Sequence, residues 1–175
     1  YGETKRSLLL MNIKIVAAAL FLLLSFSSYL KADGFYSYSL GKFDSNGYSD
    51  RYFSSYEGRF EYLSNVNFNE KYKIKPFFGL MMNTGSGKYA YLGLRKDYFL
   101  SNKWNFTPSF ATGYYHQGSS KDLGSNLQFR SQLELSLNLE NQKRIGVSIS
   151  HISNANLATH NPGTESVVIS FINPF

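Results

Sequence analysis

The sequence predicts an all-β fold: an eight-stranded antiparallel transmembrane β-barrel preceded by a signal peptide helix. Three observations favour this fold: long segments of alternating apolar and polar residues, a high aromatic content, and an apolar segment near the N-terminus. Aromatic residues make up 17% of the 175 residues, with 14 Tyr and 15 Phe, and such side chains favour strands. Charged residues are also 17%, which is below the roughly 25% of a typical soluble domain.

The N-terminal segment is interpreted as a targeting sequence that lies outside the fold. Met11 opens a short basic start, residues 15–26 are almost entirely apolar, and small residues follow up to Ala32. This three-part pattern is typical of a secretory signal peptide, and its apolar run is shorter than the ~20 residues that cross a bilayer as a helix. The predicted organisation is an upstream extension at 1–10, a signal peptide at 11–32 and an outer-membrane barrel at 33–175.

Residues 127–139 give the strongest signal for a strand. Every second position carries Leu or Phe, with Ser131 as the one exception, and polar residues fill the positions between them. A strand of about a dozen residues is longer than the average of about 5–6 and matches the ~9–11 of a tilted membrane-spanning strand. Similar alternation predicts seven further strands, at 34–41, 52–62, 72–82, 88–98, 104–114, 144–153 and 165–173.

The connections between these strands predict how the barrel is oriented. Outer-membrane barrels have short periplasmic turns and longer outer loops. Short or moderate connections fall at 65–71, 100–103 and 140–142. Polar, often Gly-rich connections alternate with them at 42–50, 83–87, 116–125 and 154–164. Both ends of the barrel are therefore expected on the periplasmic side.

A soluble eight-stranded barrel is the structural alternative, and it would turn its apolar face inward around a ligand. The second face of the predicted strands argues against it, because that face carries ionisable side chains. These are Glu57, Arg59, Lys75, Arg130 and Glu134. Such side chains fit a polar lumen, where they can pair, better than a packed interior. We therefore favour a barrel in the bacterial outer membrane.

Composition excludes several functions. The absence of cysteine removes disulfides, thiol nucleophiles and thiolate metal sites. The formal net charge is +6, but no basic cluster stands out, so a nucleic-acid partner is not supported. We predict no cofactor and no metal, and the sequence leaves the oligomeric state open.

Three polar residues interrupt the lipid-facing side of the last predicted hairpin. His151 and Ser153 are two apart in a strand, so they project from the same face, with Cα atoms about 6–7 Å apart. Glu165 opens the neighbouring antiparallel strand. All three continue the apolar series Ile145, Val147, Ile149 and Val167, Ile169, Phe171. They should therefore meet at one rim of the barrel and face the lipid.

This arrangement favours a serine hydrolase. A charged residue facing lipid costs up to about 2–4 kcal/mol at the midplane, and a nucleophile, a base and an orienting carboxylate give a functional reason for that cost. Donors near Asn161, or in its Asn-Pro-Gly turn, could stabilise an oxyanion. The alternative is that His and Ser share the strand by chance, that Asn-Pro-Gly is an ordinary turn, and that Glu165 is simply solvated.

The same residues carry a resemblance to a known family. The pattern His151-x-Ser153-Asn154, followed by Asn161-Pro162-Gly163-x-Glu165 and a final strand ending in Phe, resembles the lipid A 3-O-deacylase (PagL) family, whose members are also called acyloxyacyl hydrolases. Residues 123–131 are similar to the segment that precedes the motif in that family. The specific resemblance covers about the last 50 residues.

The resemblance implies an eight-stranded outer-membrane barrel with a Ser-His-Glu triad on its outer wall. Such an enzyme removes the acyl chain esterified at position 3 of lipid A in the outer leaflet, without a metal. It implies Ser153 as nucleophile, His151 as base, Glu165 as orienting residue and Asn161 as oxyanion-hole donor, and we assign no firm role to Asn154.

The predicted apolar contacts of the acyl chain are Phe129, Val147 and Ile149. Two other functions stay open from the sequence. One is a phospholipase resembling a larger, calcium-dependent barrel, against which the eight strands and Glu165 argue. The other is a non-enzymatic barrel for adhesion or structure.

Overall fold

The computed structural model describes residues 34–45 and 54–175, and the predicted extension and signal peptide lie outside them. Within these residues, eight long strands and one two-residue strand form a single antiparallel sheet. No described helix is long and apolar enough to cross a membrane. The strands are β1 (Gly34–Phe43), β2 (Ser55–Ser64), β3 (Lys75–Asn83), β4 (Lys88–Arg95), β5 (Tyr98–Phe99), β6 (Trp104–His116), β7 (Leu127–Asn138), β8 (Arg144–Ser153) and β9 (Thr164–Pro174). A 3-10 turn, η1 (Glu140–Gln142), joins β7 to β8.

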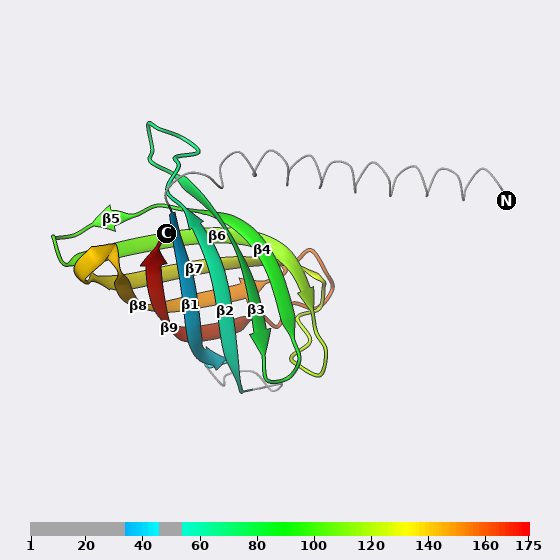
Figure 1. Cartoon of the computed structure of the whole chain (residues 1–175). Coiled ribbons are helices and arrows are strands. Elements are labelled where there is room, and N and C mark those ends of the chain that lie inside the picture. The colour runs from blue at the N-terminus through cyan, green and yellow to red at the C-terminus, as the bar shows by residue number, and fades with distance from the viewer. Residues whose placement is uncertain (1–33, 46–53) are drawn as a thin grey trace, which may run out of the picture. The chain divides into compact units, whose positions relative to one another are not determined.

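The sheet closes into a barrel, as predicted (Figure 1). Its order is β4-β3-β2-β1-β9-β8-β7-β6-β5, and the additional pairing of β4 with β6 joins the two sides. β1 pairs with β9, so the first and last strands are neighbours. The Phe175 N–H donates to the Gly34 carbonyl (3.2 Å), which places both ends of the barrel at one rim, here called the terminal end. The opposite rim is the loop end.

The predicted strand bounds differ from the structure by up to three residues at either end of the barrel. Strand 144–153 is confirmed at both ends, but residues 72–73 lie in a turn, Ile74 forms an isolated bridge to Asn69, and β3 begins only at Lys75. There the Asn69 side chain accepts from the Tyr72 N–H (3.0 Å), a local bond that competes with sheet pairing. The expected difference in loop length holds for the loop-end connections 117–126 and 154–163, which are longer than 139–143 at the terminal end, but the loop-end turn 84–87 is shorter than 65–74.

Side chains alternate between lipid face and lumen along each strand. In β8, Ile145, Val147 and Ile149 are 44–57% exposed, while the residues between them are buried. β7 shows the same alternation, and Leu133 is 48% exposed. The apolar face therefore points outward, as a membrane barrel requires. The soluble alternative, with apolar side chains turned inward, does not fit this structure.

The lumen is filled by paired polar side chains. Arg130 contacts Glu61 (2.8 Å) and Arg59 contacts Glu57, with all four side chains at most 5% exposed. Arg59 also donates to Gln132 (2.7 Å). Pairing offsets the cost of burying these charges. The sequence prediction that Arg59, Glu57 and Arg130 face the lumen is confirmed, and Glu134 is buried there as well.

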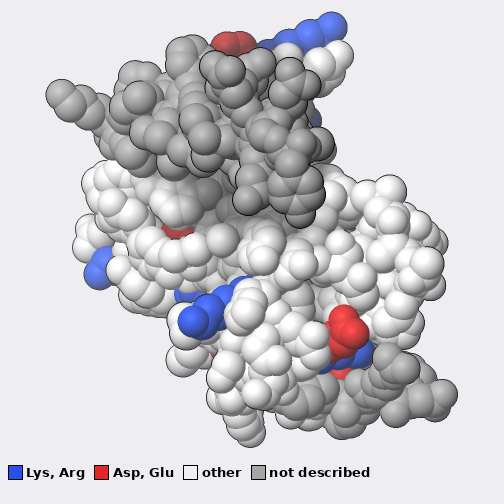
Figure 2. Space-filling view, turned by 90° about the vertical axis from the view of Figure 1, so that its right-hand side faces the viewer, with Lys and Arg blue, Asp and Glu red and all other residues white. Residues whose placement is uncertain are grey.

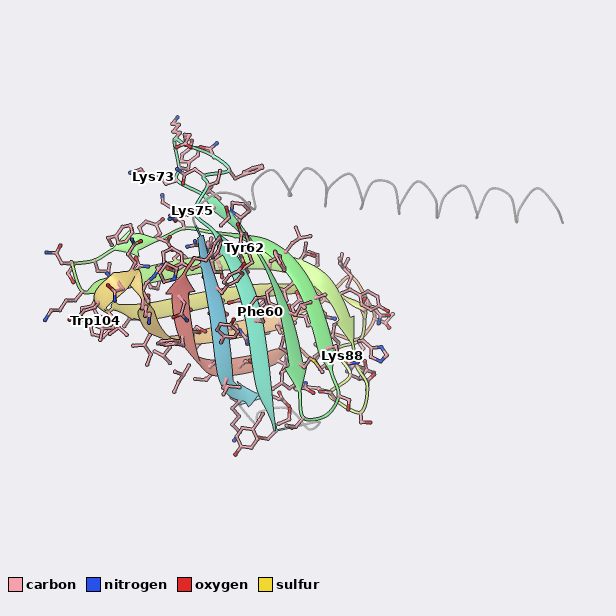
Figure 3. All side chains as sticks on the ribbon, viewed as in Figure 1. Phe60, Tyr62, Lys73, Lys75, Lys88 and Trp104 are labelled. Carbon is pink, nitrogen blue, oxygen red and sulfur yellow. The ribbon has the colours of Figure 1, made fainter. Side chains whose placement is uncertain are left out.

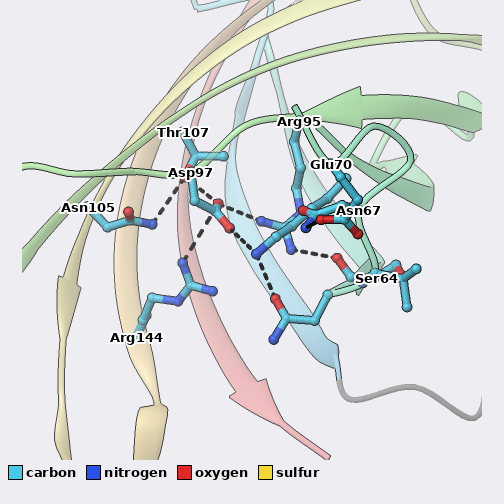
Figure 4. Close-up of polar contacts among 11 residues, drawn as sticks. Ser64, Asn67, Glu70, Arg95, Asp97, Asn105, Thr107 and Arg144 are labelled. Carbon is cyan, nitrogen blue, oxygen red and sulfur yellow. Dashed lines mark hydrogen bonds and ion pairs between the residues drawn. The ribbon is translucent and has the colours of Figure 1, made fainter. Parts of the chain in front are cut away.

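A second group of charges lies towards the terminal end of the barrel, and Figure 4 shows its polar contacts. Asp97, on the turn after β4, contacts Arg95 and Lys75 (3.2 Å), and Arg144 approaches it at 4.0 Å. The Thr107 hydroxyl donates to the same carboxylate (3.1 Å). We call Asp97, Arg95, Lys75 and Arg144 the Asp97 cluster.

Charge is sparse on the outside. On the face shown in Figure 2, a few basic and acidic side chains lie among a majority of uncharged ones. Figure 3 shows Lys73 and Lys75 towards one end of the barrel and Lys88 towards the other. Within the described strands, lipid-facing charge is thus confined to positions near the rims, where it costs least.

Candidate active site

The last hairpin brings His151 and Glu165 together on the outer wall. The two residues are direct partners in the β8–β9 register, and His151 Nδ1 lies 2.9 Å from Glu165 Oε1. Their side chains are 50% and 38% exposed. An ionised carboxylate can only accept a hydrogen bond. The contact therefore favours the imidazole tautomer with the proton on Nδ1, which leaves Nε2 free to take a proton.

Ser153 follows on the same face of β8, at its last position. It is partly exposed, and its partner across the β7–β8 register is Phe129. Among the described residues, no hydrogen bond joins the Ser153 hydroxyl to His151. In enzymes without substrate, such a bond is often long and tightens only in the complex. The structure joins two of the three predicted residues and places the third beside them.

Gly163 supplies the surface behind the His151 ring. It has a φ of +60°, and a Cβ at this position would lie 2.8 Å from His151 Cε1. The positive φ strains any residue with a side chain, and the Cβ would meet the ring. Asn-Pro-Gly is therefore more than an ordinary turn, because its glycine lets the backbone approach the imidazole closely.

Asn154 links two connections at the loop end through hydrogen bonds. It is fully buried, and its Nδ2 donates to the carbonyls of Leu123 (3.0 Å) and His160 (2.7 Å). Its backbone N–H donates to Asn161 Oδ1 (3.0 Å). Sequence reasoning assigned Asn154 no role, and the structure gives it this one.

Asn161 is thereby held next to the residue that follows Ser153. Its Nδ2 donates to Asn156 Oδ1 (2.9 Å), and a side-chain amide has two N–H donors. One donor is thus engaged, and the second is the one available to a ligand. The oxyanion role of Asn161 stays a prediction.

An apolar groove leads away from the His–Glu pair along the wall. Its volume is about 570 Å³, and its lining includes Ser131, Leu133, Ile149, His151, Glu165 and Val167. A smaller hollow of about 230 Å³ shares Leu133 and Ile149 and adds Phe106, Leu135 and Val147. Two of the predicted acyl contacts, Ile149 and Val147, line this path. Phe129 instead lies beside Ser153 and stacks on Phe110 at 6.1 Å between centroids.

Ser131 is a neighbour of the pair that sequence reasoning missed. It is the β7 partner of His151, so the imidazole stands between Glu165 on one side and Ser131 on the other. The signal was present in the sequence, because Ser131 is the one polar interruption of the apolar face at 127–139. Identifying its neighbour required the register between β7 and β8.

The fold defines a small membrane-spanning barrel of the outer-membrane type. The family model described as Lipid A 3-O-deacylase (PagL) matches residues 41–172, and the chain belongs to this family. The resemblance seen in the sequence is confirmed. Family and fold together support the outer membrane as its location, while the cleaved signal peptide stays a prediction.

Solved structures agree on the fold. The crystal structure of the outer membrane enzyme PagL is similar with a TM-score of 0.58 and 17% identity, covering 82% of this chain and 100% of that chain. A de novo designed transmembrane β-barrel gives a TM-score of 0.53 and 11% identity, covering 83% and 98%. No curated protein matches the chain.

Proposed function

We propose that this chain is an outer-membrane serine esterase that removes the acyl chain esterified at the 3-O position of lipid A. The observation that carries the proposal is the 2.9 Å contact of His151 with Glu165 on the lipid-facing wall, with Ser153 two residues further on. Membership in the PagL family supports the choice of substrate. The proposed reaction needs no metal and no cofactor.

The residues have distinct roles in this reaction. His151 Nε2 takes the hydroxyl proton of Ser153 as its oxygen attacks the ester carbonyl. Glu165 holds the proton on Nδ1 and stabilises the imidazolium that forms. When the ester bond breaks, His151 returns the proton to the sugar hydroxyl that leaves, and the acyl group stays on Ser153. Water, deprotonated by His151, then releases the fatty acid.

The oxyanion of each tetrahedral intermediate needs a donor close to Ser153. We assign the second Nδ2–H of Asn161 to this role, because Asn154 holds Asn161 beside the nucleophile (3.0 Å). Removing one donor of an oxyanion hole costs about 10²–10³-fold in kcat in a serine hydrolase. Asn161→Ala should therefore be slow but not inactive.

The position of the pair on the wall explains how substrate arrives. An acyl chain already in the outer leaflet need only move laterally to lie in the groove over Ile149 and Val147. The headgroup would then sit at the loop end, which we take as the outer side. Lateral access avoids drawing the chain through water, which costs about 0.8 kcal/mol per CH₂ exposed.

The test is mass spectrometry of lipid A from cells that produce the wild type or Ser153→Ala. Loss of one hydroxyacyl group with the wild type alone supports the proposal. Unchanged lipid A with the wild type, once the barrel is shown to be folded in the outer membrane, overturns it. Release of fatty acid from phospholipid instead would favour the phospholipase. A fluorophosphonate that labels neither protein, together with unchanged lipid A, would favour the non-enzymatic barrel.

A further inference from the structure

Lys42 is a charged residue on the lipid-facing wall next to the candidate site. It is the penultimate residue of β1, exposed, and on the same face as Tyr38 and Leu40, which are 56% and 75% exposed. Its side chain therefore points outward from the barrel. A charge on this face costs free energy, although less near the interface than at the midplane.

The register places Lys42 directly beside the groove. Its partner on β9 is Val167, which lines the groove together with His151 and Glu165. Side chains of direct partners have Cβ atoms about 4.5–5.5 Å apart, and diagonal neighbours remain within reach of long side chains. Glu165 is the outward residue next along β9, so the Lys42 ammonium can lie level with the His–Glu pair.

No described acidic side chain neutralises this ammonium. Lys42 forms no ion pair or hydrogen bond within residues 34–45 and 54–175, and Glu165, on the neighbouring strand β9, is bonded to His151. The long lysine stem can bury its methylenes on the wall and raise the charge to the headgroup level. An unpaired cation at that level attracts an anion from the membrane.

We propose that Lys42 binds a phosphate of the glycolipid headgroup while its acyl ester lies at Ser153. The inference rests on the proposed function, because the lipid A headgroup carries phosphate on the sugars to which its acyl chains are esterified. Lysine binds phosphate as a point charge. The contact would orient the sugar with its 3-O ester towards the nucleophile. Its loss would mainly raise KM.

Lys88 is a matched control. It is the first residue of β4, exposed, and on the lipid-facing side at the loop end (Figure 3). Around the barrel, β4 is separated from β8 by β6 and β7, and from β9 by β3, β2 and β1. The groove reaches β6 at Pro108 and Ser109, whereas Lys88 pairs with His116 at the loop end of that strand. Lys88 thus has the same charge at the same rim but lies away from the groove.

The experiment compares deacylation by the purified full barrel of lipid A carrying its phosphates and of the same lipid after enzymatic dephosphorylation. Lys42→Gln should lower kcat/KM on the phosphorylated lipid about tenfold, as expected for a charge-assisted hydrogen bond, mainly by raising KM. It should leave the dephosphorylated lipid unchanged. Lys42→Arg should retain most activity, and Lys88→Gln should match the wild type on both lipids.

Three results would overturn the assignment: equal losses on both lipids with Lys42→Gln, the same loss with Lys88→Gln, or no loss at all. Equal kcat/KM of the wild type on both lipids, together with inhibition by millimolar inorganic phosphate that Lys42→Gln lacks, would assign the site to the free ion and overturn the headgroup. A wild type inactive on both lipids would refute the proposed function itself, which is a distinct outcome.

Discussion

Two carboxylates at opposite ends of the barrel show how environment decides what an ionic contact does. Asp97 is 4% exposed at the terminal end, with Arg95, Lys75 and Arg144 around it. Glu165 is 38% exposed on the outer wall and contacts one histidine. The Asp97 carboxylate is surrounded by three basic side chains and the Thr107 hydroxyl. The Glu165 contact leaves Nε2 of the His151 imidazole open beside the groove. We therefore expect the Asp97 contacts to stabilise the fold and the Glu165 contact to serve catalysis.

The strongest test of this contrast is to remove the imidazole. His151→Ala should lower deacylation by about 10⁴–10⁶-fold, the scale of triad losses in serine hydrolases, and leave the free energy of unfolding nearly unchanged because the side chain is half exposed. Activity would be followed by fatty acid release and stability by urea unfolding in lipid vesicles. The double variant with Ser153→Ala should be no worse than either single one. Full activity in His151→Ala would sink the catalytic assignment.

The converse test is Asp97→Asn, which should affect stability and spare catalysis. Removing one partner of a buried pair costs about 3–5 kcal/mol, because Arg95 is left buried at 3% exposure without its counter-charge. We expect a loss near the lower end, since Asn keeps one acceptor for Thr107. If Asp97→Asn were as stable as the wild type but showed reduced deacylation per folded molecule, Asp97 would serve catalysis and not the stability of the fold.

The Asp97 cluster also predicts a pH response. Burial alone would raise the pKa of Asp97, but Arg95, Arg144 and Lys75 outweigh it and hold the pKa below its ordinary value. A carboxylate with a lowered pKa contributes stability above its ordinary pKa and loses that contribution as the pH falls towards the lowered one. The difference in unfolding free energy between wild type and Asp97→Asn should thus be constant near neutral pH and shrink only below about pH 4.

A substitution at Gly163 tests whether the His151–Glu165 pair on the outer wall depends on the close approach of the Gly163 backbone to the imidazole. Gly163→Ala should lower kcat about tenfold to a hundredfold, because a Cβ would lie 2.8 Å from His151 Cε1 and a displacement of about 1 Å can cost 10²-fold. Gly118→Ala is the matched control, since Gly118 also has a positive φ (+58°) but meets Ser86 instead of the imidazole. Equal losses per folded molecule in both variants would mean that general strain, and not the position of His151, is responsible.

The sequence predicts the wall site better than the Asp97 cluster, for a physical reason. His151 and Glu165 belong to one hairpin, so the two-residue period and a single turn bring them together. The cluster gathers Lys75, Arg95 and Arg144 from three strands around a turn residue, and only the closed sheet brings them to Asp97. Sequence periodicity identifies which face a residue takes, whereas contacts between distant strands depend on register.

The smallest expected effect concerns Ser131, which the sequence marked as an interruption but did not place. It lies across from His151 on β7 and lines the groove, without a hydrogen bond to the imidazole among the described residues. Ser131→Ala should therefore change kcat/KM by no more than about threefold, since a hydroxyl that makes no charged contact contributes about 1 kcal/mol or less. Steady-state deacylation would measure it, with Leu135→Ala as a groove variant further along β7. A hundredfold loss in kcat for Ser131→Ala alone would place a second hydroxyl in the reaction and require the roles of Ser131 and Ser153 to be reassigned.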